Sequence, residues 1–206
     1  QIEFTLKDIK ANAVKIGMLH SADLINAICK TLIDKNIIAN EDIKIVLDPV
    51  MVAKGGHRLL KDNAIDALKN FIENSKPILT PNIPEAEILT GLKIENISDM
   101  EKAARALLDL GASKVILKGG HMQSMVLTDL LIDDKNIHAI ETKKIITNDT
   151  HGTGCTMASA LSAFLAKSMS IKMAFEAAHS YVNNAIKTAP KFGNGNGPIN
   201  HCHKII

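Results

Sequence analysis

Short apolar runs alternate with amphipathic helical patterns along most of this chain, and this alternation sets the fold class. The runs are rich in Ile, Val and Leu, and they cover residues 13–19, 43–50, 76–82 and 114–120. Continuous apolar strands of this length are typical of parallel sheets that are buried on both faces. Two further runs, 126–133 and 137–145, are separated by Asp134, Lys135 and Asn136 and predict an antiparallel hairpin. The sequence therefore predicts an α/β protein, with residues 1–206 as one domain around a largely parallel sheet.

Helices are predicted between these runs, and residues that favour helix ends mark where some of them start and stop. Ser21 is expected to cap a helix that carries Leu24, Ile25, Ile28 and Leu32. Ser98 and Glu101 have the spacing of a capping box, and Gly111 is expected to end that helix. Helices are also predicted over residues 1–10, 61–73, 155–168 and 171–188.

Composition and charge exclude several classes of protein. The net charge is +2 and the lysines are scattered, so no basic patch suggests a nucleic-acid partner. No apolar run approaches the roughly 20 residues of a membrane span, and no signal peptide begins the chain. The three cysteines are far apart, which favours reduced thiols in the cytoplasm. Composition and charge therefore give no reason to expect a nucleic-acid or membrane partner.

Polar groups follow the predicted strands. They are Asp48, then Asn82 with Glu85, then Lys118 with Gly119 and Gly120, and finally the glycine-rich loop of residues 148–155. In an open α/β sheet these strand ends meet at one edge. Carboxylates, a cation and exposed backbone amides together suit a polyphosphate that carries Mg²⁺.

Each of these groups also has a simpler interpretation. Asp48 is compatible with an ordinary turn after a strand, and Lys118 with a solvated side chain beside two glycines. Asn82 and Glu85 could simply be the cap of a helix over residues 84–90, with no further role. Thr153 could likewise simply cap the helix that follows the glycine turn. The residues alone leave these alternatives open.

The loop His-Gly-Thr-Gly-Cys, residues 151–155, has the chemistry of an anion site. Gly152 and Gly154 have no side chain to block an anion, and the amides of residues 152–155 would point into the cavity. The helix dipole adds about half a positive charge there. Cys155 would sit at the helix N-terminus, where a lowered thiol pKa would let it take a proton from a hydroxyl group. Alternatively, Cys155 is a small residue that packs the first turn.

Six stretches, in this order, resemble the ribokinase-like superfamily and, within it, the hydroxymethylpyrimidine/phosphomethylpyrimidine kinases of thiamin biosynthesis. They are AVKIGML, DPVMVAKGG (48–56), TPNIPEAEILTG (80–91), ILKGGH (116–121), DTHGTGCTMASALSAFLA (149–166) and GNGNGPINH (193–201). The resemblance implies a doubly wound fold and ATP-dependent phosphorylation. The acceptor would be the hydroxymethyl oxygen of 4-amino-5-hydroxymethyl-2-methylpyrimidine, and then the phosphate of that product.

The resemblance also implies roles for individual residues. Cys155 would be the base, where most of the superfamily has aspartate, and the amides of Gly152, Thr153 and Gly154 would form the anion hole. Asn82 and Glu85 would organise Mg²⁺ and the phosphates, with Asp48 facing the phosphates. Lys118 and Gly120 would lie on the nucleotide side. His179 stands where the family usually has a lysine near the nucleotide, so weaker nucleotide binding is expected.

The family's N-terminal strand and the segments that cover its pyrimidine pocket have no counterpart here. The sequence is therefore expected to be N-terminally truncated, with a central strand missing and two apolar strand edges left unpaired. Pyridoxal kinase activity is an alternative, and so is an inactive fragment or a subunit that needs an N-terminal partner. The family also makes a homodimer plausible. The terminal residues His201, Cys202 and His203 are expected to be disordered and not to bind a metal.

Overall fold

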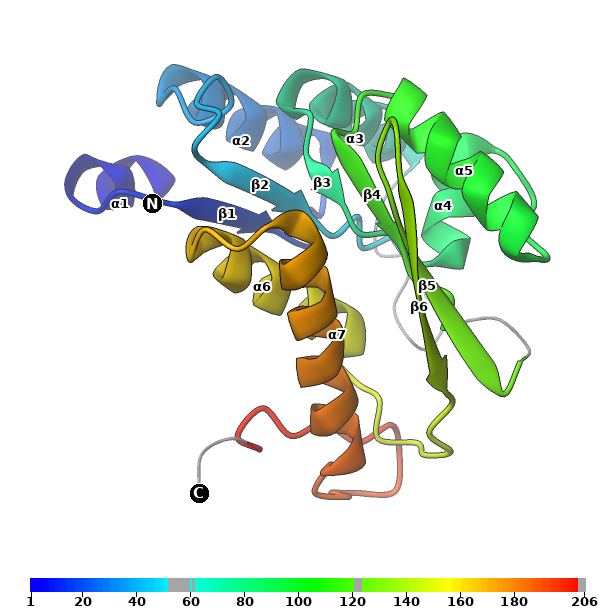
Figure 1. Ribbon diagram of the computed structural model, residues 1–206. Coiled ribbons are helices and arrows are strands. Elements are labelled where there is room, and N and C mark those ends of the chain that lie inside the picture. Colours follow the sequence, from blue (N-terminus) through cyan, green and yellow to red (C-terminus); the bar gives the residue numbers. More distant parts are fainter. Residues whose placement is uncertain (52–59, 61, 121–123, 204–206) are drawn as a thin grey trace.

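Figure 1 shows the computed structural model, in which residues 1–51, 60, 62–120 and 124–203 are described. In chain order the elements are α1 (Ile2–Asp8), β1 (Ala13–Ile16), α2 (Ala22–Asp34), β2 (Lys44–Leu47), α3 (Asp62–Ser75), β3 (Ile78–Leu79), α4 (Ile83–Thr90), α5 (Ile97–Asp109), β4 (Lys114–Leu117), β5 (Val126–Ile132), β6 (Ile137–Lys143), α6 (Thr153–Ala166) and α7 (Ile171–Lys187). Parts of two quoted stretches, residues 52–56 and His121, lie outside the described residues.

The strands form one sheet in which spatial order follows chain order, from β1 to β6. Strands β1 to β4 are parallel, and β5 and β6 add an antiparallel hairpin at one end. This arrangement confirms the predicted α/β fold with its mostly parallel sheet and hairpin. Strand β3 is only two residues long, because Pro77 and Pro81 flank it and cannot donate to a strand ladder.

The expectation of a central gap in the sheet is wrong. All six strands that the structure describes are neighbours without interruption, so no inner strand edge is left unpaired. The open edges among them are the outer edges of β1 and β6.

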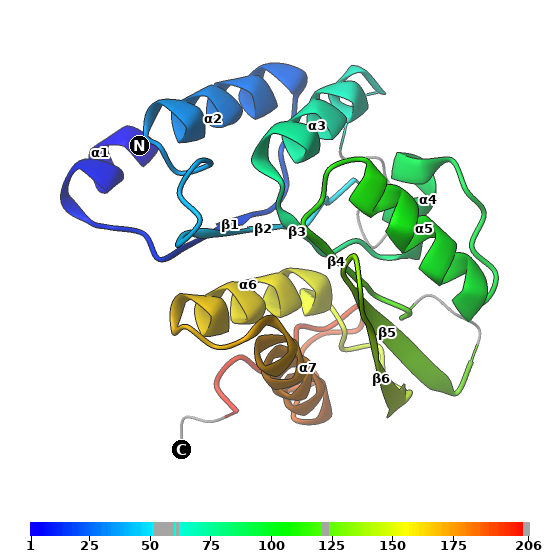
Figure 2. The same ribbon diagram turned by 45° about the horizontal axis from the view of Figure 1, so that its top comes forward.

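Helices cover both faces of the sheet, as Figure 2 shows with α1 to α5 on one side and α6 and α7 on the other. Alternate residues of each strand point to opposite faces. In β2, Leu47 therefore packs into the core beneath α2 to α5, and its neighbour Val46 packs against α6 and α7. Burial on both faces explains why the strands appear in the sequence as continuous apolar runs.

The ends of two helices differ from the prediction. Asn96, and not Ser98, caps α5, because its Oδ1 accepts a hydrogen bond from the Asp99 backbone N–H at 3.0 Å. Gly111 follows the end of α5 with a φ of 114°, a conformation that favours glycine. Helix α6 begins at Thr153, two residues earlier than expected. Ser21 does cap α2, since its side chain accepts from the Leu24 backbone N–H.

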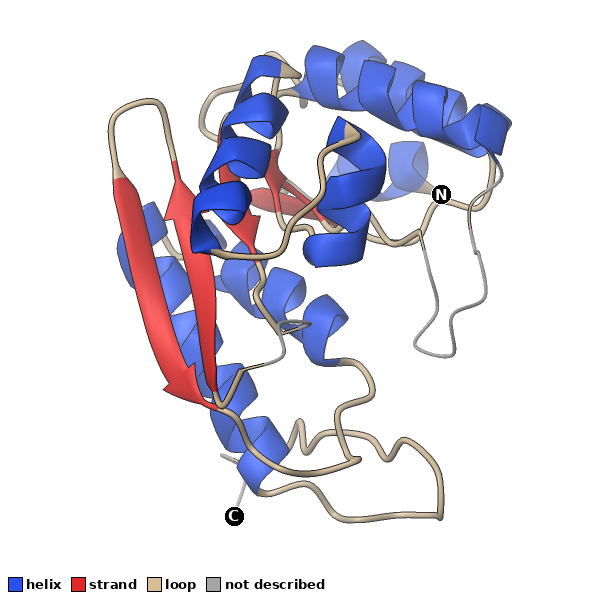
Figure 3. Ribbon diagram, turned by 90° about the vertical axis from the view of Figure 1, so that its right-hand side faces the viewer, coloured by secondary structure: helices blue, strands red, loops and turns tan. Residues whose placement is uncertain are grey.

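Helix α7 runs beside the hairpin, and the chain then returns along α6 and α7 (Figure 3). The expectation of a disordered tail is wrong for residues 201–203. The ring of His203 lies 4.6 Å from that of Tyr181, and its Nδ1 is 3.0 Å from the Asn200 carbonyl oxygen. None of the helices in the described part of the chain is long and apolar enough to span a membrane.

Candidate active site

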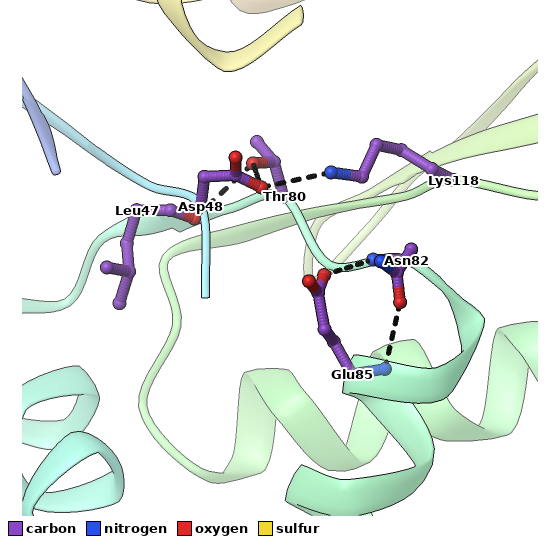
Figure 4. A network of polar contacts seen from close by, with 6 residues as sticks. All are labelled: Leu47, Asp48, Thr80, Asn82, Glu85 and Lys118. Carbon is purple, nitrogen blue, oxygen red and sulfur yellow. Dashed lines mark hydrogen bonds and ion pairs between the residues drawn. The ribbon is translucent and has the colours of Figure 1, made fainter. Parts of the chain in front are cut away.

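A buried ion pair joins the ends of two strands. Asp48, which follows β2, is only 2% exposed, and its Oδ1 lies 3.0 Å from Nζ of Lys118, which follows β4. The Thr80 hydroxyl, after β3, lies 3.5 Å from the same oxygen (Figure 4). Three adjacent strand ends therefore contribute to one polar group. Asp48 is thus not an isolated turn residue, and Lys118 is not a solvated lysine.

Asn82 and Glu85 form a complete capping box at the start of α4. The Glu85 backbone N–H donates to Asn82 Oδ1 at 2.9 Å, and the Asn82 backbone N–H donates to Glu85 Oε2 at 2.8 Å (Figure 4). The helix-capping interpretation of these residues is therefore confirmed. Asn82 also pairs with Lys118 through a parallel bridge, which places the capping box next to the ion pair.

Glu85 is an unusual capping residue because it is 3% exposed. Burial is the main reason that the pKa of its carboxyl group is raised to about 7. Lys118 and the Asn82 backbone oppose this rise, and the charge of Asp48 adds to it. The carboxyl group therefore titrates near neutral pH. A cation placed between Glu85 and Asp48 would favour the charged form of Glu85.

The glycine-rich loop lies against the ion pair. Gly152 caps α6 with a φ of 87° and provides no side-chain hydrogen bond. Thr153 does not cap the helix either, since its hydroxyl donates to the Thr150 carbonyl oxygen at 2.8 Å. A Cβ atom added to Gly154 would lie 3.2 Å from Lys118 Nζ, so this glycine allows the loop to approach the lysine. Gly154 and the lysine thus lie side by side, whereas the Thr153 N–H donates to the Thr150 carbonyl oxygen at 3.4 Å.

Cys155 is exposed at the first turn of α6, and its thiol interacts with the Asp48 carboxylate. The expectation of a lowered thiol pKa is wrong. Partial desolvation and the negative charge of Asp48 raise the pKa, and the opposing effects of Lys15 and Lys118 are smaller than the total increase. The sequence showed the helix N-terminus but not that the cysteine would face a carboxylate.

Lys15 is a site residue that sequence reasoning missed. Its side chain lies along the end of β1, so that a Cβ atom added to Gly17 would be only 2.5 Å from its Nζ. The neighbouring Val14 packs against the core under α2 to α5, so Lys15 points to the face covered by α6. Its charge lowers the pKa of Cys155. The signal in the sequence was a lysine inside an otherwise apolar strand.

A second polar group holds the turn after β4. The Gly119 backbone N–H donates to Asp129 Oδ1 at 2.8 Å, and a Cβ atom on Gly119 would lie 2.1 Å from the Thr128 carbonyl oxygen. Burial raises the pKa of Asp129, whereas the Gly119 hydrogen bond, His179 and Lys118 lower it. Asp129 was also missed, although it is an acidic residue in the middle of an apolar run.

His179 belongs to this second group and not to the ion pair. Its Nε2 lies 3.1 Å from the Thr142 hydroxyl and 3.8 Å from Asp129 Oδ2. Gly120 follows Gly119 and has nothing within 4 Å of an added Cβ atom, so no neighbour requires a glycine there. The structure thus brings the predicted residues into two linked groups, one around Asp48 and one around Asp129.

Within the described residues, no cluster of three or more His, Cys, Asp or Glu side chains could hold a metal ion alone. Mg²⁺, however, is usually held by one or two carboxylates together with substrate phosphates. Asp48 and the buried Glu85 fit that use, because the charge of Asp48 already acts on Glu85 and an added cation would compensate both carboxylates.

The profile of the family described as phosphomethylpyrimidine kinase matches residues 1–200. A hydroxymethylpyrimidine/phosphomethylpyrimidine kinase of Bacillus subtilis (strain 168) is 42% identical over 202 residues, which cover 98% of this chain and 73% of the relative. A pyridoxal kinase from Staphylococcus aureus, solved in complex with AMP-PCP and pyridoxal, has a TM-score of 0.87 and 32% identity, with 100% of this chain and 72% of that chain covered.

Phosphomethylpyrimidine kinase from Clostridium difficile 630 has a TM-score of 0.76 and 35% identity, with 90% of this chain and 73% of that chain covered. These neighbours share the ribokinase-like fold, and the related proteins are named as kinases, which are phosphotransferases. Since the family profile spans residues 1–200, this chain belongs to the phosphomethylpyrimidine kinase family.

Proposed function

We propose that this protein transfers the γ-phosphoryl group of ATP to the hydroxymethyl oxygen of 4-amino-5-hydroxymethyl-2-methylpyrimidine, and then to the phosphate of the product. The observation that carries the proposal is that the glycine loop lies against the Asp48–Lys118 ion pair, with Cys155 in the following turn and within reach of the Asp48 charge. This group combines a proton acceptor, a cation and helix N-terminal amides within one space. The names of the relatives supply the substrate class.

In the first transfer, the Cys155 thiolate takes the proton of the substrate hydroxyl. The hydroxyl oxygen forms a bond to the γ-phosphorus, the bond to the bridging oxygen breaks, and ADP leaves with that oxygen. The amides of Gly152 and Gly154 stabilise the charge on the phosphoryl oxygens in transfer. The Thr153 N–H would join them only on leaving the Thr150 carbonyl oxygen, to which it donates at 3.4 Å. Lys118 Nζ lies 3.2 Å from the point that a Cβ atom on Gly154 would occupy, close enough to contact the same oxygens.

On the nucleotide side, the turn of Lys118 and Gly120 receives the phosphates of ATP, and His179 lies near the nucleotide. Asp48 faces the phosphates from the neighbouring strand end. Asn82 and Glu85 organise Mg²⁺, which would neutralise phosphate charge. An ATP-consuming enzyme whose three cysteines are unpaired fits the cytoplasm.

The test is release of ADP by the 206-residue chain with ATP, Mg²⁺ and one acceptor at a time. Turnover is expected with the hydroxymethylpyrimidine and with its monophosphate, and a much lower kcat/KM with pyridoxal. Pyridoxal is the second candidate because a close structural neighbour was solved with it. A higher kcat/KM with pyridoxal would reverse the assignment, and no turnover with any acceptor by the folded chain would reject it for this chain.

Glu85→Gln is expected to remove a pH dependence of stability. Folding raises the Glu85 pKa from an ordinary value near 4.3 to about 7, so the stability that this carboxyl group contributes is fully present below about pH 4 and is lost as the pH rises through 7. This contribution amounts to about 3 kcal/mol between pH 4 and pH 9. Glutamine still accepts the Asn82 N–H and so keeps the capping box. Urea unfolding at several pH values measures the difference.

Glu95→Gln is the matched control, because this glutamate is exposed and should retain the wild-type pH dependence. Mg²⁺ with ADP should stabilise the wild type at pH 9 more than it stabilises Glu85→Gln. Parallel pH curves for the wild type and Glu85→Gln would contradict the burial argument. Equal stabilisation by Mg²⁺ and ADP would contradict the metal role.

A further inference from the structure

The segment of residues 197–201, the C-terminal strap, lies against the glycine-rich loop. The His151 backbone N–H donates to the Gly197 carbonyl oxygen at 3.0 Å, and the Ile199 N–H donates back to the His151 carbonyl oxygen at 3.4 Å. The Asn200 N–H donates to the Ala185 carbonyl oxygen at 2.9 Å, near the end of α7. Backbone hydrogen bonds therefore join the strap to the glycine-rich loop at one point and to α7 at another.

The strap also fits closely against the loop. A Cβ atom on Gly197 would lie 1.9 Å from Asp149 Oδ1, so only glycine permits this approach. Asp149 is itself held, because the Thr147 hydroxyl donates to its Oδ2 at 3.1 Å. Ile199 is 3% exposed and anchors the strap by burial.

His201 extends this contact to the first turn of α6. Its Nε2 lies 2.9 Å from the hydroxyl oxygen of Thr156, which is only 8% exposed and directly follows Cys155. The backbone carbonyl of His201 accepts a hydrogen bond of 2.7 Å from the Tyr181 hydroxyl. The backbone of His201 is thus held by α7, and its imidazole contacts a residue of α6.

This turn lacks the usual local restraint. Helices α2, α4, α5 and α7 each begin with a side chain that accepts a backbone N–H, from Ser21, Asn82, Asn96 and Ser170 respectively. Helix α6 begins with Gly152, which provides no side-chain hydrogen bond and has the flexibility of glycine. Beyond the hydrogen bond from the Thr153 hydroxyl to the Thr150 carbonyl oxygen, restraint on the turn that carries Cys155 comes from elsewhere in the fold.

We propose that His201 is a positioning residue that, through Thr156, fixes the first turn of α6 and so orients Cys155 and the neighbouring loop amides. Its importance for catalysis rests on the proposed function, whereas its effect on the geometry of Cys155 does not. The C-terminal strap is then a part of the site that touches no reacting atom. An anion hole gains from such fixed donors, because they need not reorganise as charge develops.

The first measurement is the rate at which iodoacetamide alkylates Cys155 at pH 8, resolved by peptide mass spectrometry. His201→Ala should free the turn and increase this rate at least threefold. His201→Gln retains a hydrogen-bonding group and should stay closer to the wild-type rate. Thr156→Val removes the same hydrogen bond from the other side, with little change in shape, and should reproduce His201→Ala. The double variant should add nothing further, because both changes remove one interaction.

Cys202→Ser is the matched control, since Cys202 is adjacent to His201 and its side chain is exposed. It should leave the alkylation of Cys155 unchanged. Alkylation of the half-buried Cys29 on α2 reports general unfolding and should also be unchanged. An unchanged Cys155 rate in His201→Ala would overturn the proposal, even if the melting temperature fell. If that variant does not fold, an unchanged rate in Thr156→Val would do the same.

The second measurement is kinase turnover. His201→Ala should lower kcat at least tenfold and leave the KM for ATP within twofold, because Lys118 and Asp48 are not moved. A rise in KM alone would contradict positioning of the base. Absence of turnover in the wild type would reject the proposed function for this chain, and the alkylation rates would still decide whether His201 positions Cys155.

Discussion

Replacing Cys155 by alanine is expected to lower kcat by 100-fold or more, while the affinity for ATP stays within twofold. A general base contributes about 10²- to 10⁴-fold to a proton-transfer step, and alanine cannot accept a proton. Cys155 is exposed at the start of α6, so its loss leaves no buried cavity. Steady-state ADP release measures the rate, and equilibrium titration with ATP measures binding.

Cys155→Asp separates the loss of a base from the loss of a thiol. A carboxylate at this position should restore part of the rate lost in the alanine variant, although the nearby Asp48 disfavours a second negative charge. In the wild type, desolvation and Asp48 raise the thiol pKa, so kcat/KM should still be rising at pH 8. Near-normal turnover in Cys155→Ala would show that Cys155 is not the base.

Lys118→Met is expected to destabilise the protein by about 3–5 kcal/mol, because it leaves the buried Asp48 carboxylate without its partner. Asp48 is 2% exposed, so water cannot replace the lost interaction. The double variant Asp48→Asn with Lys118→Met should recover most of the loss, since an amide carries no charge. Urea unfolding at pH 7 measures all three proteins.

Lys102→Met provides the matched control for the effect of burial. Lys102 Nζ lies 3.1 Å from Asp99 Oδ1, a separation close to that of the buried pair, but the lysine side chain is 68% exposed. Its removal should leave the urea midpoint unchanged, because exposed ion pairs contribute little. Equal losses in Lys102→Met and Lys118→Met would mean that burial of Asp48 is not the cause.

Local sequence patterns predicted the strands and most of the site. The apolar runs located β2 and β4, whose residues are buried on both faces, and also β1, which is only partly buried at the edge of the sheet. The rule that ligands bind at strand ends led to Asp48 and Lys118. The boundary of α5 was missed because two polar residues close together could each cap it, and packing selected Asn96 over Ser98. Boundaries of this kind depend on the tertiary structure.

Some properties of the site depend on contacts between residues that are far apart in the sequence, and these properties could not be predicted. Asp129 in β5 holds Gly119 after β4, and Lys15 reaches the end of β1 next to α6. The sequence shows each as a charged residue in an apolar run, but it does not show which residue each one contacts. The raised pKa of Cys155 likewise depends on Asp48, which comes from another strand. The His201–Thr156 contact joins residues that are 45 positions apart.

The agreement between strand order and chain order also bears on how the protein folds. Each strand from β1 to β6 pairs with its neighbour in the chain, so the sheet can grow stepwise as the chain is synthesised. Helix α6 must then return from Thr153 to pack on β1 and β2, which closes the longest loop in the fold. The glycine loop and its strap arrive with that helix. Folding intermediates that already have most of the sheet will therefore lack the glycine-rich loop in its final place. If that loop binds phosphate as proposed, catalytic competence should be the last property acquired during folding.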